Sequence, residues 1–334
     1  MSSRTRIAQP TVCFGHRTAL QILRAAKPGE LAPEKGAAPK LPGHAPRSEL
    51  LRETLRRLEA DHPGLRLEEP VHVLVGTPNC RAGKACRPHV REGFLPGSAL
   101  LRLDEDVAVC SPELALVQEA RWEKSEVALL ELAWELCVSY RTRRTGMPPA
   151  YDVEPLTSVQ ALRRFVARNP SLDGARKVAR ILAYLADGSA SARETKLALV
   201  MGLPLAKGGH GLGIPRMNFE VEAAARARAI AGRRSFRCDL CWSEAKLDVE
   251  YQSRESHEGE LNRIRDSRRA NALATMGWTV IGVTGNELDS LAATDAIAEA
   301  IRLRLGKRAR TAVADHHARK LGLRRRLGLP ARYV

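Results

Sequence analysis

The stretch FRCDLCWSEAKLDVEYQS, residues Phe236 to Ser253, has the pattern of two short strands joined by a tight turn. Side chains along a strand alternate between its two faces with a period of two. This alternation predicts that most apolar residues of both strands share one face, while Asp239 and Glu250 share the other. The hairpin therefore predicts a sheet with one face that carries carboxylates.

The turn fixes the expected register of the two strands. If Ser243 to Lys246 form a four-residue hairpin loop, Trp242 pairs with Leu247 and Asp239 stands opposite Glu250. Cross-strand neighbours have Cβ atoms about 4.5 to 5.5 Å apart, a separation at which like charges repel. A divalent cation that prefers oxygen ligands would compensate them. The alternative is a solvated polar face on which Arg237 or Lys246 pairs with the carboxylates.

Two cysteines in the same stretch, Cys238 and Cys241, have the spacing of a metal or redox pair. Their odd separation along a regular strand sends the two thiols to opposite faces, which excludes a shared metal ion. We therefore expect Cys238 to fill the core and Cys241 to lie beside Asp248.

Length and composition indicate a two-domain globular protein. The chain has 334 residues, of which 44% are apolar, enough for a sizeable core. Aromatic residues make up 4%, which argues against a stacking platform for single-stranded nucleic acid.

Positive charge is concentrated at the C-terminus. The formal net charge is +16, and residues 302–334 alone contain 11 basic residues and one acidic residue. Such a segment suits contacts with a phosphate backbone, and a solubilising tail is the alternative.

The odd number of cysteines, 7, does not suggest a disulfide framework. We find neither an apolar run long enough to cross a membrane nor a signal-peptide pattern. These features predict a cytoplasmic protein with reduced thiols and no membrane partner.

The pattern divides the chain into four segments. Residues 1–150 are expected to form a mainly helical region with a few strands. Its segment 27–47, rich in Pro, Gly and Lys, is expected to be an exposed loop. Residues 151–190 are expected to form a helical connector. Residues 191–305 are expected to form an α/β core, and residues 306–334 are expected to form a basic tail.

Within the first segment, helices are expected at 18–26, in the stretch 48–64 with Ser48 as N-cap and Gly64 after the helix end, and from Ser111 and Pro112 onward. A strand is expected at Pro70–Pro78. Cys80, Cys86 and His89 follow that strand. Their spacing is not that of a usual zinc site and no fourth ligand is evident, so a basic surface loop is the simpler interpretation.

The α/β core begins with a helix at Ser191, where Glu194 three residues later completes a capping-box pattern. The glycine-rich loop at 207–215 matches neither a P-loop nor a dinucleotide fingerprint, so we expect no small-molecule cofactor. After the hairpin, the pattern predicts a helix from His257, a strand at Trp278–Thr284 and a helix that runs to about Leu305.

The motifs SARETKL, RCDLCWSEAKLDVEYQS, RDSRRANAL and GWTVIGVT, in this order, resemble the PD-(D/E)XK nuclease superfamily, in the branch of the very-short-patch-repair endonucleases. The resemblance covers about 191–305. It implies a restriction-endonuclease-like C-terminal domain with a mixed central sheet flanked by helices. The N-terminal region resembles that of abortive-infection antitoxin-type regulators, which implies DNA binding or regulation.

The resemblance implies a role for each matched residue. Glu194, Asp239 and Glu250 match the ligands of a Mg²⁺ or Mn²⁺ ion that activates water to attack a phosphodiester. Gln252 stands where many members have Lys, and His257 matches a histidine that acts as general acid or base or contacts phosphate.

The helix that follows offers further candidates. Asp266 and Arg269 match an R-D-x-x-R segment of the family, and because they lie one helical turn apart we expect them to form a structural ion pair. Arg237, Arg268 and Arg269 are the candidates for contacts with the DNA backbone.

The expected function is therefore metal-dependent endonucleolytic hydrolysis of DNA. The alternative is a DNA-binding regulator of antitoxin type that keeps the nuclease fold without cleavage, a reading that Gln252 leaves open. DNA is the expected partner, and a homodimer is one assembly that we allow for.

Overall fold

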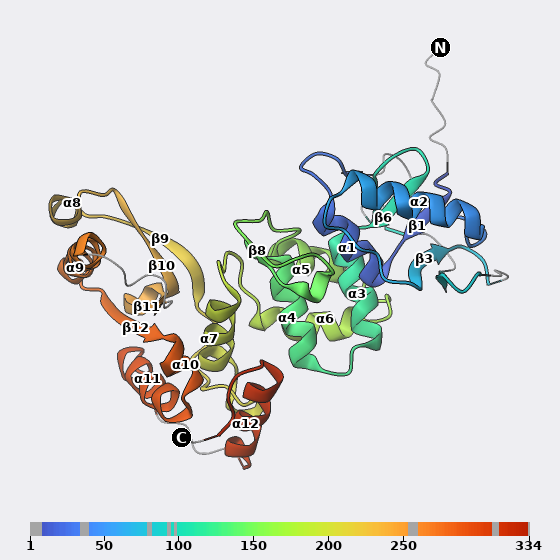
Figure 1. Cartoon of the computed structure of the whole chain (residues 1–334). Helices are drawn as coiled ribbons and strands as arrows, with labels where there is room; N and C mark the ends of the chain where they lie inside the picture. Colours follow the sequence, from blue (N-terminus) through green and yellow to red (C-terminus); the bar gives the residue numbers. More distant parts are fainter. Residues whose placement is uncertain are drawn as a thin grey trace. The chain divides into compact units, whose positions relative to one another are not determined.

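The chain folds into two units, each built from helices and a β-sheet, so it belongs to the mixed α/β class that the sequence predicts. The N-terminal unit comprises residues 1–136 and 141–182, and the C-terminal unit comprises 137–140 and 183–334. The computed structural model (Figure 1) describes residues 9–33, 40–78, 82–91, 95–96, 99–252, 260–308 and 314–332.

The N-terminal unit contains a six-stranded sheet of order β2-β5-β6-β1-β3-β4. Strand β1 runs parallel to β6 and antiparallel to β3, and β3 runs parallel to β4. The strands are β1 (Val12–Phe14), β2 (Ala32–Pro33), β3 (Val71–Val75), β4 (Cys86–Val90), β5 (Leu100–Arg102) and β6 (Val107–Cys110).

Helices of this unit follow the apolar periodicity of the sequence. Ser111 caps α3 through its side chain, as predicted, and the helix is interrupted before α4 begins. The predicted cap Ser48 is instead the first residue of α2, and Arg47 precedes it. The helices are α1 (His16–Ala25), α2 (Ser48–Asp61), α3 (Pro112–Trp122), α4 (Glu126–Leu136), α5 (Val159–Arg168) and α6 (Ala175–Ile181).

Several short elements lie near the points at which the chain passes from one unit to the other. Strands β7 (Tyr140–Arg141) and β8 (Ala150–Tyr151) pair with each other, and two 3₁₀ turns lie at Arg143–Thr145 and Leu182–Tyr184. Within the expected loop at 27–47, β2 is exposed, but Leu41 is buried.

The C-terminal unit is organised around a four-stranded sheet of order β12-β11-β10-β9. Strands β9 to β11 are antiparallel neighbours, and β11 runs parallel to β12. The sheet is therefore mixed, as the sequence predicts for this part of the chain. Its strands are β9 (Arg216–Glu222), β10 (Ser235–Trp242), β11 (Leu247–Gln252) and β12 (Thr279–Thr284).

Helix α9 is the connection that parallel pairing of β11 and β12 requires. Helices α8 and α9 lie side by side and close a small core with Phe236 of β10 (Figure 1). The helices are α7 (Ala192–Gly202), α8 (Ala225–Ala231), α9 (Glu260–Thr275), α10 (Gly285–Asp289), α11 (Leu291–Arg304) and α12 (His316–Arg326), with 3₁₀ turns at Leu205–Lys207 and Ser243–Ala245.

The basic C-terminal segment contains a packed helix rather than only a tail. Arg324 of α12 is fully buried and donates to the carbonyl oxygens of Leu288 and Asp289 at 2.8 Å and of Pro330 at 2.6 Å. Lys320 is buried as well and lies 2.6 Å from a carboxylate oxygen of Asp295. Part of the positive charge is therefore used to attach α12 to the unit.

We predict that Arg324→Leu destabilises the C-terminal unit by about 3 kcal/mol, because several buried carbonyls lose their donor together. Hydrogen exchange measured by mass spectrometry over α10 to α12 should accelerate accordingly. The matched control is Arg325→Ala, since Arg325 is exposed. Equal exchange in the two variants would contradict the anchoring role of Arg324.

Candidate active site

The hairpin of β10 and β11 forms with the predicted register. Trp242 pairs with Leu247, and Lys246 closes the turn in the left-handed conformation at φ 48°. The paired positions run from there to Leu240 and Val249. Asp239 and Glu250 lie just beyond the last pair, so they do not form the cross-strand pair that we expected.

Beyond this point β10 departs from regular strand geometry. Its ladder with β9 omits Asp239 and the facing Asn218, which has a φ of 46°. Cys238 and Cys241, three residues apart, lie in one apolar cluster and their side chains are hydrogen-bonded. The prediction that the two thiols point to opposite faces is therefore wrong, because it assumed an uninterrupted period of two.

The Cys238 thiol nevertheless has the predicted role of core filler. The hydrogen bond to Cys241 and burial raise the pKa of Cys238, so it stays protonated. Cys241 is buried and pairs with Asp248 across the strands, as expected.

Asp239 turns its side chain toward β11. Its carboxylate accepts a hydrogen bond from the Tyr251 backbone N–H at 3.0 Å, where a regular ladder would use a carbonyl. Burial, followed by repulsion from Glu194, raises the pKa of Asp239 to about 6. Glu194 and Asp239 therefore lie close enough for their charges to interact.

Glu194 is buried at the first turn of α7 and has the predicted capping role. Its carboxylate accepts hydrogen bonds from the Ala190 N–H at 3.0 Å and from the Ser191 hydroxyl at 2.9 Å. It also accepts one from the Asn218 side chain at 2.9 Å, which connects α7 to β9. Glu194 thus combines a structural cap with a position beside Asp239.

Glu250 and Asp248 project toward α9, where Arg269 forms an ion pair with each of them. The Asp248 carboxylate is fully buried and lies 3.1 Å from the guanidinium. Burial raises the pKa of Asp248 despite Arg269. Arg269 also donates to the backbone oxygen of Arg237 at 2.6 Å. The expected ion pair of Arg269 with exposed Asp266 is replaced by these contacts.

Among the described residues, Glu194, Asp239 and Glu250 do not form a group of three with ligand oxygens within 4.8 Å of one another. Glu194 and Asp239 lie near each other, whereas Glu250 is held by Arg269. The three carboxylates are hard oxygen donors of the kind that Mg²⁺ and Mn²⁺ prefer. Glu250 would join the other two as a ligand only on release from Arg269.

The other predicted site residues surround this arrangement. The Gln252 side chain lies over Gly282 of β12, where a Cβ atom would be 2.8 Å from its nitrogen. Arg237 donates to the Asn218 side-chain oxygen at 2.7 Å. Arg268 is exposed beside a cavity of about 320 Å³ that Arg233 and Arg265 also line. His257 lies outside the described residues.

Sequence reasoning missed a cluster of three histidines in the N-terminal unit. His16, His72 and His89 place ligand nitrogens within 4.8 Å of one another, and no other such group of three occurs among the described residues. His89 had been considered only with Cys80, which lies outside the described residues, and with Cys86. The presence of a histidine in each of two neighbouring strands could have indicated this cluster, but the sequence does not show that the two strands pair with each other.

None of the helices in the described part of the chain combines the length and the apolar run that a bilayer crossing requires.

We predict that Asp239→Asn stabilises the metal-free protein at pH 7.5 by about 2 kcal/mol and changes little at pH 4. The folded carboxyl has a pKa of about 6, against 3.8 for an aspartate in an unfolded chain, so between these values the native state holds a proton that the unfolded chain has released. Wild-type stability therefore falls as pH rises through this window. Urea unfolding at both pH values measures it, and a stability difference independent of pH would contradict the assignment.

We predict that Arg269→Leu destabilises the protein by about 3 kcal/mol at pH 8, because a buried carboxylate loses its cation. The loss should shrink as the pH falls, because burial raises the pKa of Asp248 and so favours its protonated form, and Asp248→Asn in the same chain should restore part of the stability. Thermal unfolding followed by circular dichroism tests both. Arg268→Leu is the control, since Arg268 is exposed on the same helix, and an equal effect of both arginine variants would refute the ion-pair account.

Comparison with known proteins identifies relatives that are themselves uncharacterized. No family model matches the chain, and no solved structure matches it. Two uncharacterized proteins of Mycobacterium tuberculosis, from strains CDC 1551 / Oshkosh and ATCC 25618 / H37Rv, are each 32% identical over 111 residues. The match covers 33% of this chain, and the chain spans about a third, 36%, of the length of each relative.

Proposed function

We propose that the C-terminal unit hydrolyses DNA phosphodiester bonds with the help of a divalent metal ion. The observation that supports this most is the proximity of Glu194 and Asp239, whose mutual repulsion contributes to the raised pKa of Asp239. Two carboxylates that lie close together are costly for folding, and perturbed carboxyl groups of this kind gather at functional sites. A bound cation would remove that cost.

Glu194 and Asp239 would hold Mg²⁺ or Mn²⁺, which supplies an activated water and neutralises charge on the phosphate. Glu250 lies on the neighbouring strand and would add a third carboxylate once Arg269 turns away. Gln252, next but one to Glu250, would contribute an amide to water or phosphate rather than a positive charge. His257, the proposed acid or base, completes the residue set taken from the resemblance.

Positive side chains around the hairpin supply the chemistry for a nucleic-acid partner. Arg233, Arg265 and Arg268 line one surface cavity beside α9, and Arg237 is exposed on β10. Such side chains make salt-dependent contacts with backbone phosphates. We therefore propose double-stranded DNA as the substrate.

A second candidate function is DNA binding without cleavage. It is favoured by the ion pair between Glu250 and Arg269 and by Gln252 in place of a lysine. In that case the site residues would serve the fold, and the arginines would bind DNA.

We further propose that the protein acts in the cytoplasm. In the described part of the chain, the cysteines are all buried and none of them forms a disulfide: Cys13, Cys86, Cys110, Cys137, Cys238 and Cys241. Free thiols are typical of a reducing compartment.

We predict that the purified chain nicks supercoiled plasmid DNA in Mg²⁺ or Mn²⁺, and that Asp239→Asn lowers the rate by about 100-fold or more because the metal loses a ligand. Glu250→Gln should also lower the rate. Glu222→Gln changes an exposed carboxylate on the adjacent strand β9 and serves as the matched control. Agarose gel analysis of the plasmid forms over time gives the rates.

Gel retardation on the same plasmid, without metal, separates the two candidates. The nuclease proposal fails if the wild type does not cut while all variants still retard DNA. That result would support the non-cleaving regulator. Cutting that Asp239→Asn leaves unchanged would instead locate the activity elsewhere.

A further inference from the structure

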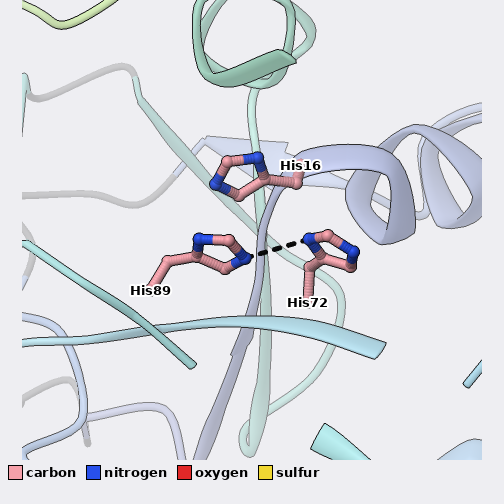
Figure 2. A group of neighbouring side chains, drawn as sticks. All are labelled: His16, His72 and His89. Carbon is pink, nitrogen blue, oxygen red and sulfur yellow. Dashed lines mark hydrogen bonds between the residues drawn. The ribbon is translucent and has the colours of Figure 1, made fainter. Parts of the chain in front are cut away.

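Three imidazole side chains meet at one end of the N-terminal sheet. His72 lies on β3 and His89 on the parallel strand β4, whose register aligns His89 with Leu74. His16 is the first residue of α1, directly after β1 and Gly15. Figure 2 shows the three rings facing one another, with the His89 Nε2 and the His72 Nδ1 2.9 Å apart.

Backbone contacts hold these histidines in place. The Gly15 N–H donates to the His72 oxygen at 3.0 Å, and the His72 N–H donates to the Thr18 hydroxyl at 2.9 Å. A Cβ atom at Gly15 would lie 2.9 Å from the Leu74 side chain, so a glycine is needed there. The β1 to α1 connection is therefore tightly fitted to β3.

His16 itself adopts a backbone conformation that only glycine adopts freely, with a φ of 55°. Its N–H donates to the Gln118 side-chain oxygen at 2.8 Å. A residue other than glycine in this region costs about 1 kcal/mol or more, and such strain gathers at functional sites. The His16 imidazole lies beside the other two rings (Figure 2).

The immediate surroundings suit ligation of a metal ion. His16 is buried, and its Nδ1 lies 3.3 Å from a Glu119 carboxylate oxygen. A carboxylate that accepts from a histidine ring is the usual outer partner of a metal-ligating imidazole, because it fixes the ring orientation and raises its basicity.

One side of the cluster opens to solvent. A cavity of about 380 Å³ is lined by His16 and His89 together with Gln118, Arg121 and Trp122. Three protein ligands beside an accessible cavity match the arrangement of metal sites that keep a position for water or another small ligand. A purely structural core cluster has no need of such access.

We propose that His16, His72 and His89 bind one divalent transition-metal ion that prefers imidazole nitrogen, of the zinc class, with its remaining position open to this cavity. Tetrahedral coordination with metal–nitrogen bonds of about 2.0 to 2.1 Å places ligand nitrogens roughly 3.3 Å apart. The nitrogens already lie within 4.8 Å, so rotation of the rings completes the geometry. The stacked rings of His16 and His89, with centroids 3.8 Å apart, are the pair that must turn.

The site is chemically distinct from the carboxylate site of the C-terminal unit. Three imidazole nitrogens favour Zn²⁺, Co²⁺ or Ni²⁺, whereas carboxylates favour Mg²⁺ and Mn²⁺. The proposal therefore does not depend on nuclease activity.

The test is a Co²⁺ titration of the metal-stripped full-length protein, read from the visible absorption of the bound ion and followed by displacement with Zn²⁺. We expect one Co²⁺ per chain in the wild type. His89→Gln should weaken binding at least 100-fold, and Glu119→Gln about 10-fold, since loss of an outer partner typically costs 10- to 100-fold. The control His317→Ala, which changes an exposed histidine, should bind as the wild type does.

Circular dichroism of each variant confirms that it is folded. If His89→Gln does not fold, Glu119→Gln decides the matter together with a Zn²⁺-dependent rise in the melting temperature of the wild type. Absence of Co²⁺ binding by the wild type overturns the proposal. Binding that His89→Gln and Glu119→Gln leave unchanged, or a thiolate absorption band that replaces the imidazole spectrum, overturns it as well.

Discussion

The ion pair between Arg269 and the buried Asp248 is the interaction on which the C-terminal unit depends. Asp248 has no exposed surface, and a carboxylate in that position is tolerated only with a cation and hydrogen bonds to satisfy it. Arg269 provides the cation and a hydrogen bond to one of the two carboxylate oxygens, and it also bonds the backbone of β10. One side chain of α9 thereby fixes the crossover helix against both strands of the hairpin.

That constraint has a consequence for the candidate site. Arg269 satisfies Glu250 as well as Asp248, which leaves Asp239 and Glu194 as the carboxylates that repel each other. The interrupted strand at Asp239 directs its side chain to the Tyr251 amide instead of into a cross-strand pair. These four carboxylates therefore fall into two pairs. Arg269 compensates Asp248 and Glu250 under α9, whereas it leaves Asp239 and Glu194, between α7 and β10, to repel each other.

Much of this fold follows from local patterns in the sequence. The hairpin register, the Ser191 cap with Glu194 and the Ser111 cap all depend on residues a few positions apart, and all three predictions are confirmed. Strand β9 and helix α12 were not expected. The first follows a glycine-rich loop that obscures its alternation, and the second has a strongly basic sequence that resembles a solvated tail.

The site was harder to predict than the fold, for a physical reason. The interruption at Asp239 and Asn218 is a tertiary feature, so a regular alternation assigned Cys238 and Cys241 to the wrong faces. Arg269 could be matched to Asp266 by helical spacing, but its actual partners lie on another element. His16, His72 and His89 come from three segments whose pairing only the folded sheet reveals.

The two units thus offer two kinds of ligand, oxygen in one and imidazole nitrogen in the other. The most direct test of the proposed carboxylate metal site is Mn²⁺ binding to the full-length protein at pH 7.5, measured by electron paramagnetic resonance of the free ion. We expect the wild type to bind Mn²⁺ at this site. Asp239→Asn should abolish this binding, and His89→Gln should preserve it. Mn²⁺ binding that survives Asp239→Asn, or none in the wild type, would contradict the proposed site.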